Sequence, residues 1–86
     1  MLRDIATIKN ISKIRLIEVG EGQPFFTAYF YSTDGKKFLY NVDEIRLNNV
    51  TLDWDAGSDI EFSETLSCSI KEETENNFRI ASCQRD

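Results

Sequence analysis

Apolar and polar residues alternate along residues 60–70, and this alternation constrains the fold more than any other feature of the chain. In an extended segment, one face would carry five apolar side chains: Ile60, Phe62, Leu66, Cys68 and Ile70. Glu64 is the only charged residue on that face, and the other face is polar throughout. A period of two over this length is typical of a strand in an antiparallel sheet with one buried face.

Further segments rich in β-forming residues occur along the chain, separated by segments containing Gly, Asn or Pro; they span residues 11–19, 25–31, 36–42, 50–54 and 78–80. Helical periodicity is confined to short stretches, of which residues 41–47 could form one turn with Asp43 near its start. A chain of 86 residues is long enough for only one core. We therefore predict a single domain, residues 1–86, with an all-β fold. The expected architecture is a small antiparallel barrel of five or six strands with at most one short helix, and a small β-sandwich is the alternative.

Asp34-Gly35 predicts a hairpin between two of these segments, because a two-residue turn of this type needs positive φ angles. In that register Tyr31 lies opposite Phe38, and Tyr29 lies opposite Tyr40. Five rings then share one face of the hairpin: Phe25, Tyr29, Tyr31, Phe38 and Tyr40. A three-residue turn with a bulge would shift the pairing and change these neighbours.

Seven of the ten aromatic residues lie between Phe25 and Tyr40, which makes this hairpin the main candidate binding surface. Aromatic rings on a sheet can stack unpaired nucleic-acid bases. Four basic residues lie near enough in the sequence to contact phosphates: Lys13, Arg15, Lys36 and Lys37. The competing interpretation is that this aromatic face is the core, although the tyrosine hydroxyls favour a surface in contact with water.

The net charge of −5 is unevenly distributed. Residues 1–47 carry seven basic and six acidic side chains, whereas residues 48–86 carry three basic and nine acidic ones. Nucleic-acid-binding domains usually have a basic excess, so the acidic second half suggests a different function. In that alternative, an acidic face docks a basic protein partner, as an inhibitor or nucleic-acid mimic would; its residues are Asp53, Asp55, Asp59 and Glu61. Their spacing does not fit a calcium-binding EF-hand loop, so we predict a solvated turn and no metal site.

Catalysis is not expected, because the chain contains no histidine to support a nucleophile or act as a general base. We therefore predict a non-enzymatic protein without a cofactor. No apolar run is long enough to span a membrane, and no secretory leader is visible at the N-terminus, so we expect a cytoplasmic location and no membrane partner. Self-association through an exposed strand edge is a further expectation that fits either function.

Cys68 and Cys83 are the only cysteines, and reduced thiols are the expectation for a chain without a leader. They lie in the two strands of a final hairpin whose register has two solutions. If Ile70 lies opposite Ile80, the apolar faces match best and the cysteines fall on opposite faces. If the turn is centred on Glu75-Asn76, Cys68 lies opposite Cys83 and Glu72 lies opposite Arg79. We favour the first register on its better match of the apolar faces.

Residues 11–30 resemble the opening of OB-fold single-stranded-DNA-binding proteins, of the small kind that occurs in phages, plasmids and integrative elements. The Gly22-Gln23-Pro24-Phe25 segment matches the step by which that family enters its second strand, and residues 66–83 are similar to its final long hairpin. Two features depart from the family pattern: the helix expected between strands three and four lacks support, and the second half is acidic. The resemblance implies an OB-like barrel that binds single-stranded nucleic acid on its strand two–three face, where Tyr29, Tyr31, Phe38 and Tyr40 would lie.

Overall fold

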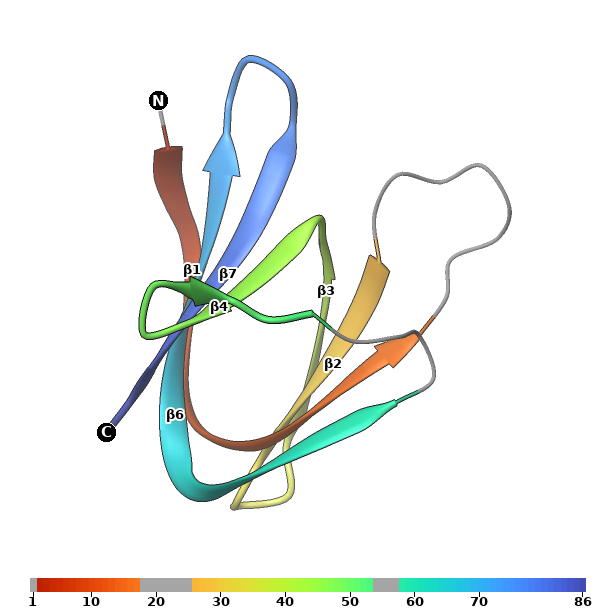
Figure 1. The fold of residues 1–86 in the computed structure, drawn as a ribbon, viewed down its shortest axis with the longest axis vertical. Helices are drawn as coiled ribbons and strands as arrows, with labels where there is room; N and C mark the ends of the chain where they lie inside the picture. The colour runs from red at the N-terminus through yellow and green to blue at the C-terminus, as the bar shows by residue number, and fades with distance from the viewer. Residues whose placement is uncertain (1, 18–25, 54–57) are drawn as a thin grey trace.

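The computed structural model describes residues 2–17, 26–53 and 58–86, and most of them lie in β-strands (Figure 1). The strands are β1 (Leu2–Ile17), β2 (Phe26–Ser32), β3 (Lys37–Val42), β4 (Glu44–Leu47), β5 (Val50–Thr51), β6 (Asp59–Glu73) and β7 (Phe78–Arg85). The predicted all-β class is therefore confirmed. The helical turn considered for residues 41–47 is not present, because residues 44–47 form β4. The described residues contain no helix long and apolar enough to cross a membrane.

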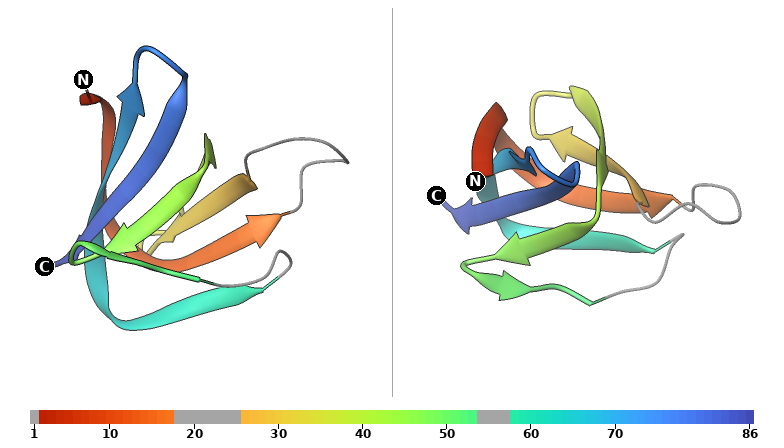
Figure 2. Two further views of the ribbon diagram at one scale, coloured as in Figure 1. Left: turned by 45° about the horizontal axis from the view of Figure 1, so that its top comes forward. Right: turned by 90° about the horizontal axis from the view of Figure 1, so that it is seen from above.

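The seven strands form one sheet in the order β3-β2-β1-β6-β7-β4-β5. Neighbouring strands are antiparallel except β4 and β7, which run parallel. The sheet curves strongly without closing into a barrel (Figures 1 and 2). The fold is thus a single mixed sheet of seven strands, where the sequence predicted an antiparallel barrel of five or six strands or a two-sheet sandwich.

The parallel pairing arises because the chain passes from β3 to β4 without a hairpin. Only Asp43 separates the two strands, so β4 continues in the direction of β3 and meets β7 in parallel. The Asp43 backbone N–H donates to the Arg79 carbonyl at 2.9 Å, and the Arg79 N–H donates to Asp43 Oδ2 at 2.8 Å. The Asp43 side chain therefore takes the place of a backbone acceptor where the strand changes partners.

The two longest strands, β1 and β6, carry the curvature of the sheet. They pair with each other at both ends, and the pairing shifts in register between Asp4 and Ala6, between Ile8 and Ile11, and between Ile11 and Lys13. Asn10, within one of these irregular stretches, has a φ of 61°. Irregularities of this kind bend a strand and increase its twist, and both strands turn in the same region of Figure 1.

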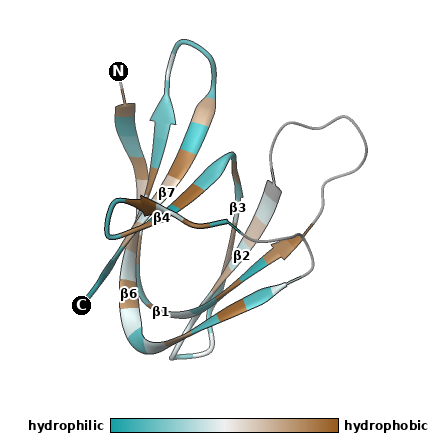
Figure 3. Cartoon of the chain, in the orientation of Figure 1, coloured by the Kyte–Doolittle hydropathy of each residue, from teal (hydrophilic) through white to brown (hydrophobic). Residues whose placement is uncertain are grey.

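The core lies on the inner side of the curved sheet. Its buried residues are Ile8, Ile11, Ile14, Leu16, Ala28, Phe30, Val42, Ile45, Leu66, Cys68, Ile70, Ala81 and Cys83. Bands of opposite hydropathy alternate along β6 in Figure 3, as predicted for residues 60–70. Ile60 and Phe62 are partly buried, whereas Glu64 is exposed because it lies in a stretch of β6 without a partner on β1.

The final hairpin adopts the register that the apolar pattern did not favour. Cys68 lies opposite Cys83 and forms a disulfide with it, with Cα atoms 4.0 Å apart, and Glu72 lies opposite Arg79. The register with Ile70 opposite Ile80 is wrong, and the structure pairs the thiols that we expected to be reduced. Ala81 faces Ile70 instead, while Ile80 points to the other side of β7 and is buried there. The apolar pattern predicted the wrong register of β6 with β7, because β7 has buried residues on both of its faces.

Candidate functional site

The turn between β2 and β3 determines which aromatic rings share a face. Thr33, Asp34 and Gly35 form a three-residue turn, in which the Ser32 N–H donates to the Lys36 carbonyl at 2.9 Å and Gly35 has a φ of 87°. The Ser32 hydroxyl bonds to the Asp34 carboxylate and accepts the Lys36 N–H at 3.1 Å. These side-chain bonds stabilise the longer turn, so the two-residue Asp34-Gly35 turn that we expected is not formed.

The longer turn shifts the pairing of β2 and β3 by one residue and divides the aromatic rings between two faces. Tyr40 lies opposite Ala28, and Phe38 lies opposite Phe30, which is fully buried. Phe38 and Tyr40 pack against the core, and the Tyr40 ring lies edge-on to the Phe30 ring, with the two ring centres 6.2 Å apart. The predicted face of five rings is therefore wrong: Phe38 and Tyr40 face inward, and Phe25 lies outside the described residues.

Tyr29 and Tyr31 occupy the outer face of the sheet, where the strand registers place basic residues around them. Tyr31 lies between Lys13 on β1 and Lys37 on β3, and Tyr29 lies between Arg15 on β1 and Leu39 on β3. We call this surface the tyrosine patch and define it by six residues: Lys13, Arg15, Tyr29, Tyr31, Lys37 and Leu39. Five of these residues belong to the predicted binding surface. Leu39 is new to it, because the two-residue turn would have placed Leu39 on the opposite face from both tyrosines.

Within the tyrosine patch, cations lie close to both rings. The Lys13 Nζ is 4.5 Å and the Arg15 Cζ 5.8 Å from the centre of the Tyr31 ring, and the Lys37 Nζ is 4.9 Å from the centre of the Tyr29 ring. The two rings are 6.3 Å apart and inclined by 40°. Both tyrosines are partly exposed, and Leu39 is 53% exposed. Cation–π contacts at exposed sites contribute only about 0.5–1 kcal/mol each, so a ligand can displace these cations from the rings.

Acidic residues of β6 border the tyrosine patch. Asp59 lies opposite Arg15 and accepts two hydrogen bonds from its guanidinium, at 2.7 and 2.9 Å. These bonds lower the pKa of Asp59 and raise that of Arg15. Glu61 lies opposite Lys13 but forms no hydrogen bond or ion pair with any residue that the structure describes.

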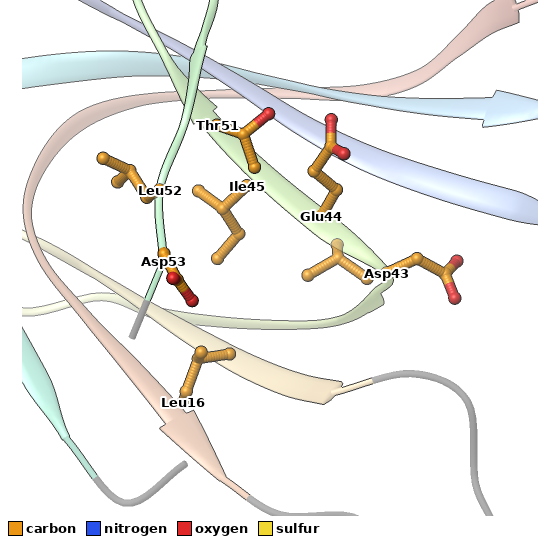
Figure 4. Close-up of a pocket in the computed structure, with 8 residues that line it drawn as sticks. Leu16, Asp43, Glu44, Ile45, Thr51, Leu52 and Asp53 are labelled. Atoms are coloured by element: carbon orange, nitrogen blue, oxygen red, sulfur yellow. The ribbon is translucent and has the colours of Figure 1, made fainter. Parts of the chain in front are cut away.

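Of the four acidic residues predicted to form one face, the structure describes three: Asp53, Asp59 and Glu61. Asp59 and Glu61 lie beside the basic residues of β1. Asp53 lines a separate cavity of about 220 Å³ with Leu16, Val42, Asp43, Glu44, Ile45, Thr51 and Leu52. Figure 4 shows Leu16, Ile45 and Leu52 around this cavity, with the carboxylates of Asp43 and Glu44 directed away from them. Asp55 lies outside the described residues.

The remaining predicted site residue, Lys36, directly follows the turn, and its Nζ is 3.9 Å from the Asp34 carboxylate. It therefore differs from its neighbour Lys37, which contacts the Tyr29 ring. Within residues 2–17, 26–53 and 58–86, no three His, Cys, Asp or Glu side chains are grouped so that they could hold a metal ion. The arrangement offers flat aromatic rings, on which planar groups can stack, and cationic groups, which attract anions.

Leu39 was not predicted as a patch residue, because the length of the turn decides which β3 side chains share a face with Tyr29 and Tyr31. The Ser32 and Asp34 side chains that stabilise the longer turn were the available signal. No known protein family, curated protein or solved structure matches this chain.

Proposed function

We propose that the protein is a non-catalytic module that binds single-stranded nucleic acid through the tyrosine patch. The observation that carries the proposal is the pair of partly exposed tyrosine rings, 6.3 Å apart, with three cationic side chains around them. Stacking on aromatic rings tolerates any base sequence, and each stacked base contributes about 1–3 kcal/mol by alanine substitution.

The charges around the rings suit a phosphate backbone despite the net charge of −5. Neither Lys13 nor Lys37 forms an ion pair with a residue in the described part of the chain, so both ammonium groups are available to phosphates. Arg15 is shared with Asp59, which reduces its contribution. With two or three phosphate contacts, the logarithm of the binding constant should fall with the logarithm of salt concentration with a slope of about −1.4 to −2.

The strand connectivity supports the OB-like part of the proposal. β1 pairs with both β2 and β6, and β7 pairs with the continuation of β3, so the chain encloses the core as a partly open barrel would. In OB folds the strand two–three face commonly binds oligonucleotides, and the tyrosine patch includes residues of β2 and β3. The resemblance to small single-stranded-DNA-binding proteins of phages, plasmids and integrative elements belongs to the same proposal.

The alternative of an acidic docking face receives less support from the geometry. Asp59 is already paired with Arg15, and Asp53 lines a cavity whose lining includes neither Asp59 nor Glu61. A basic partner would therefore meet a border of mixed charge rather than a continuous acidic face. We accordingly propose nucleic acid rather than a basic protein as the partner.

Fluorescence anisotropy with labelled single-stranded oligonucleotides at low salt tests the proposal. We expect a dissociation constant on the order of 10 µM, and a loss of about 5- to 150-fold for Tyr29→Ala and for Tyr31→Ala. Tyr29→Phe and Tyr31→Phe are the matched controls, because they keep the stacking ring and should retain the affinity. Absence of binding by the folded wild-type protein would contradict the proposal, as would an alanine variant that binds as tightly as the wild type.

A cytoplasmic location is a further part of the proposal, and the disulfide makes it directly testable. Disulfides persist mainly in oxidising compartments, so a cytoplasmic protein should carry free Cys68 and Cys83 thiols in living cells and form the bond only after extraction. Lysis of the cells directly into a denaturant that contains N-ethylmaleimide, which exposes these buried side chains to the reagent, followed by mass spectrometry, should then show both cysteines modified. An unmodified, disulfide-bonded protein would contradict the cytoplasmic location.

A further inference from the structure

A groove opens next to the tyrosine patch where β6 separates from β1. Lys13 lies opposite Glu61 and Ile11 lies opposite Leu66, so residues 62–65 of β6 face only Ser12 on β1. The resulting open groove has a volume of about 390 Å³ and is lined by Ser12, Lys13, Tyr31, Glu61 and Phe62. This volume falls within the usual range for small-molecule sites, about 300–1,000 Å³.

The groove combines aromatic walls with groups of opposite charge. Tyr31 offers a ring on the outer face, Phe62 adds apolar surface while packing against the core, and the Lys13 ammonium lies 4.5 Å from the centre of the Tyr31 ring. Glu61 has no ion pair or hydrogen bond with the described residues, whereas Asp59, two positions earlier, is fully engaged by Arg15. One carboxylate is therefore left available at the edge of a surface that otherwise presents cations.

An ionised carboxylate only accepts hydrogen bonds, and this restricts the base that can lie against Glu61. Guanine is the one common base that offers two adjacent donors, N1–H and the N2 amino group, on its Watson–Crick edge. Adenine and cytosine present an amino group beside an acceptor nitrogen, and thymine presents a single N–H between two carbonyls. Lysine only donates, so the Lys13 ammonium complements the O6 acceptor on the same edge of guanine.

We propose that this groove binds one guanine of the bound strand, with Glu61 accepting from N1–H and N2–H and Lys13 donating to O6. Tyr31 would stack on one face of the base, as aromatic side chains do for bases of single strands, and Phe62 would add an apolar contact in the groove. This inference rests on the proposed function, because the tyrosine patch must first hold the strand beside the groove. It adds a preference for guanine that stacking alone does not supply.

Anisotropy titrations with oligothymidylate and with the same oligonucleotide carrying one central guanine, inosine or adenine test this inference. We expect guanine to bind at least about fivefold more tightly than adenine, with inosine, which lacks the N2 amino group, in between. Glu61→Gln should abolish the preference for guanine without weakening the binding of oligothymidylate. Glu64→Gln is the matched control, because Glu64 is exposed, lies in the same irregular stretch and does not line the groove.

The possible outcomes distinguish this inference from the proposed function. If oligothymidylate binds but guanine and adenine bind equally, the groove does not recognise guanine, although the tyrosine patch binds nucleic acid. A preference that survives Glu61→Gln also overturns the assignment. If no oligonucleotide binds, both the groove assignment and the proposed function are wrong.

Discussion

Lys36 and Lys37 are neighbours in the sequence, but the structure gives them different surroundings. The Lys37 ammonium lies over the Tyr29 ring in the tyrosine patch, whereas the Lys36 ammonium lies beside Asp34 of the turn. From the sequence alone the two lysines were equivalent candidates for phosphate contacts. The length of the turn distinguishes them, because a turn of three residues rather than two places Lys37, and not Lys36, on the outer face.

We expect Lys37→Ala to weaken oligonucleotide binding several-fold for every base sequence and Lys36→Ala to leave it nearly unchanged. Loss of one phosphate contact should also make the salt dependence shallower by about 0.7 in slope. Anisotropy titrations at a series of salt concentrations provide both quantities. Equal effects of the two substitutions would contradict a phosphate contact that is specific to Lys37.

At the scale of the strands, Glu72 connects three elements near one end of the sheet. This buried glutamate of β6 accepts hydrogen bonds from Arg79 on β7 at 2.9 Å and from Arg3 on β1 at 3.3 Å. The bond from Arg79 contributes most to lowering the pKa of Glu72, and Arg3 adds to it against the opposing effect of burial. In the folded protein, Glu72 therefore holds its proton less tightly than in the unfolded chain.

Because its pKa is lower in the folded state, Glu72 should stabilise the fold above its ordinary pKa of 4.5, and this contribution should disappear as the pH falls through the lowered value. We therefore expect Glu72→Gln to lower the melting temperature at pH 7, with a difference from the wild type that shrinks below pH 4.5. Thermal unfolding followed by circular dichroism across this range measures the difference. Glu64→Gln, at an exposed position of the same strand, should follow the wild-type curve. A constant difference at all pH values would contradict this role of the Glu72 ion pairs.

The disulfide joins β6 and β7 between buried residues, with a separation of 15 positions in the sequence. A cross-link that closes a loop of this size restricts the unfolded chain and stabilises the fold by about 3 kcal/mol. Urea unfolding should therefore show a lower midpoint when a reductant is present. The double substitution Cys68→Ala/Cys83→Ala should make the midpoint insensitive to the reductant. A wild-type midpoint that does not change on reduction would contradict a stabilising role.

Sequence reasoning reached the strands themselves more readily than their partners. The alternation in residues 60–70 predicted that Leu66, Cys68 and Ile70 are buried, and they are. Burial of one strand face can be predicted locally, because it follows from the order of apolar and polar residues along that strand. The predicted register of β2 with β3 was wrong by one residue, because Asp-Gly occurs in turns of two and of three residues. Changing the turn length by one residue moves every side chain of β3 to the other face relative to β2. The register of β6 with β7 was missed because Ile80 is buried on the other side of its strand from Ala81.

At the scale of the whole molecule, the parallel pairing of β4 with β7 could not be predicted from the order of apolar and polar residues within either strand. It joins residues 44–47 to residues 80–83 and depends on the passage from β3 to β4 through Asp43. The same limit applies to the tyrosine patch, whose members come from three strands spread over residues 13–39. Residue types indicated a binding surface, but only the registers of three strands showed which residues share it.

The overall charge also has a different meaning in the folded protein. Within the acidic second half of the chain, Asp59 is paired with Arg15 of β1, and Glu72 is paired with Arg3 of β1 and with Arg79 of β7. The cations of the tyrosine patch lie together on one side of β1, β2 and β3. A net charge of −5 is therefore compatible with a local surface that attracts phosphate.

The central claim is that the outer face of β1, β2 and β3 receives the nucleic acid, and a nuclear magnetic resonance titration of the ¹⁵N-labelled protein with a short oligothymidylate tests it most directly. We predict that the largest changes in amide chemical shift will occur at the tyrosine patch, with only small changes along β4 and β7. Large changes confined to β4 and β7, or no changes at saturating oligonucleotide, would contradict the claim.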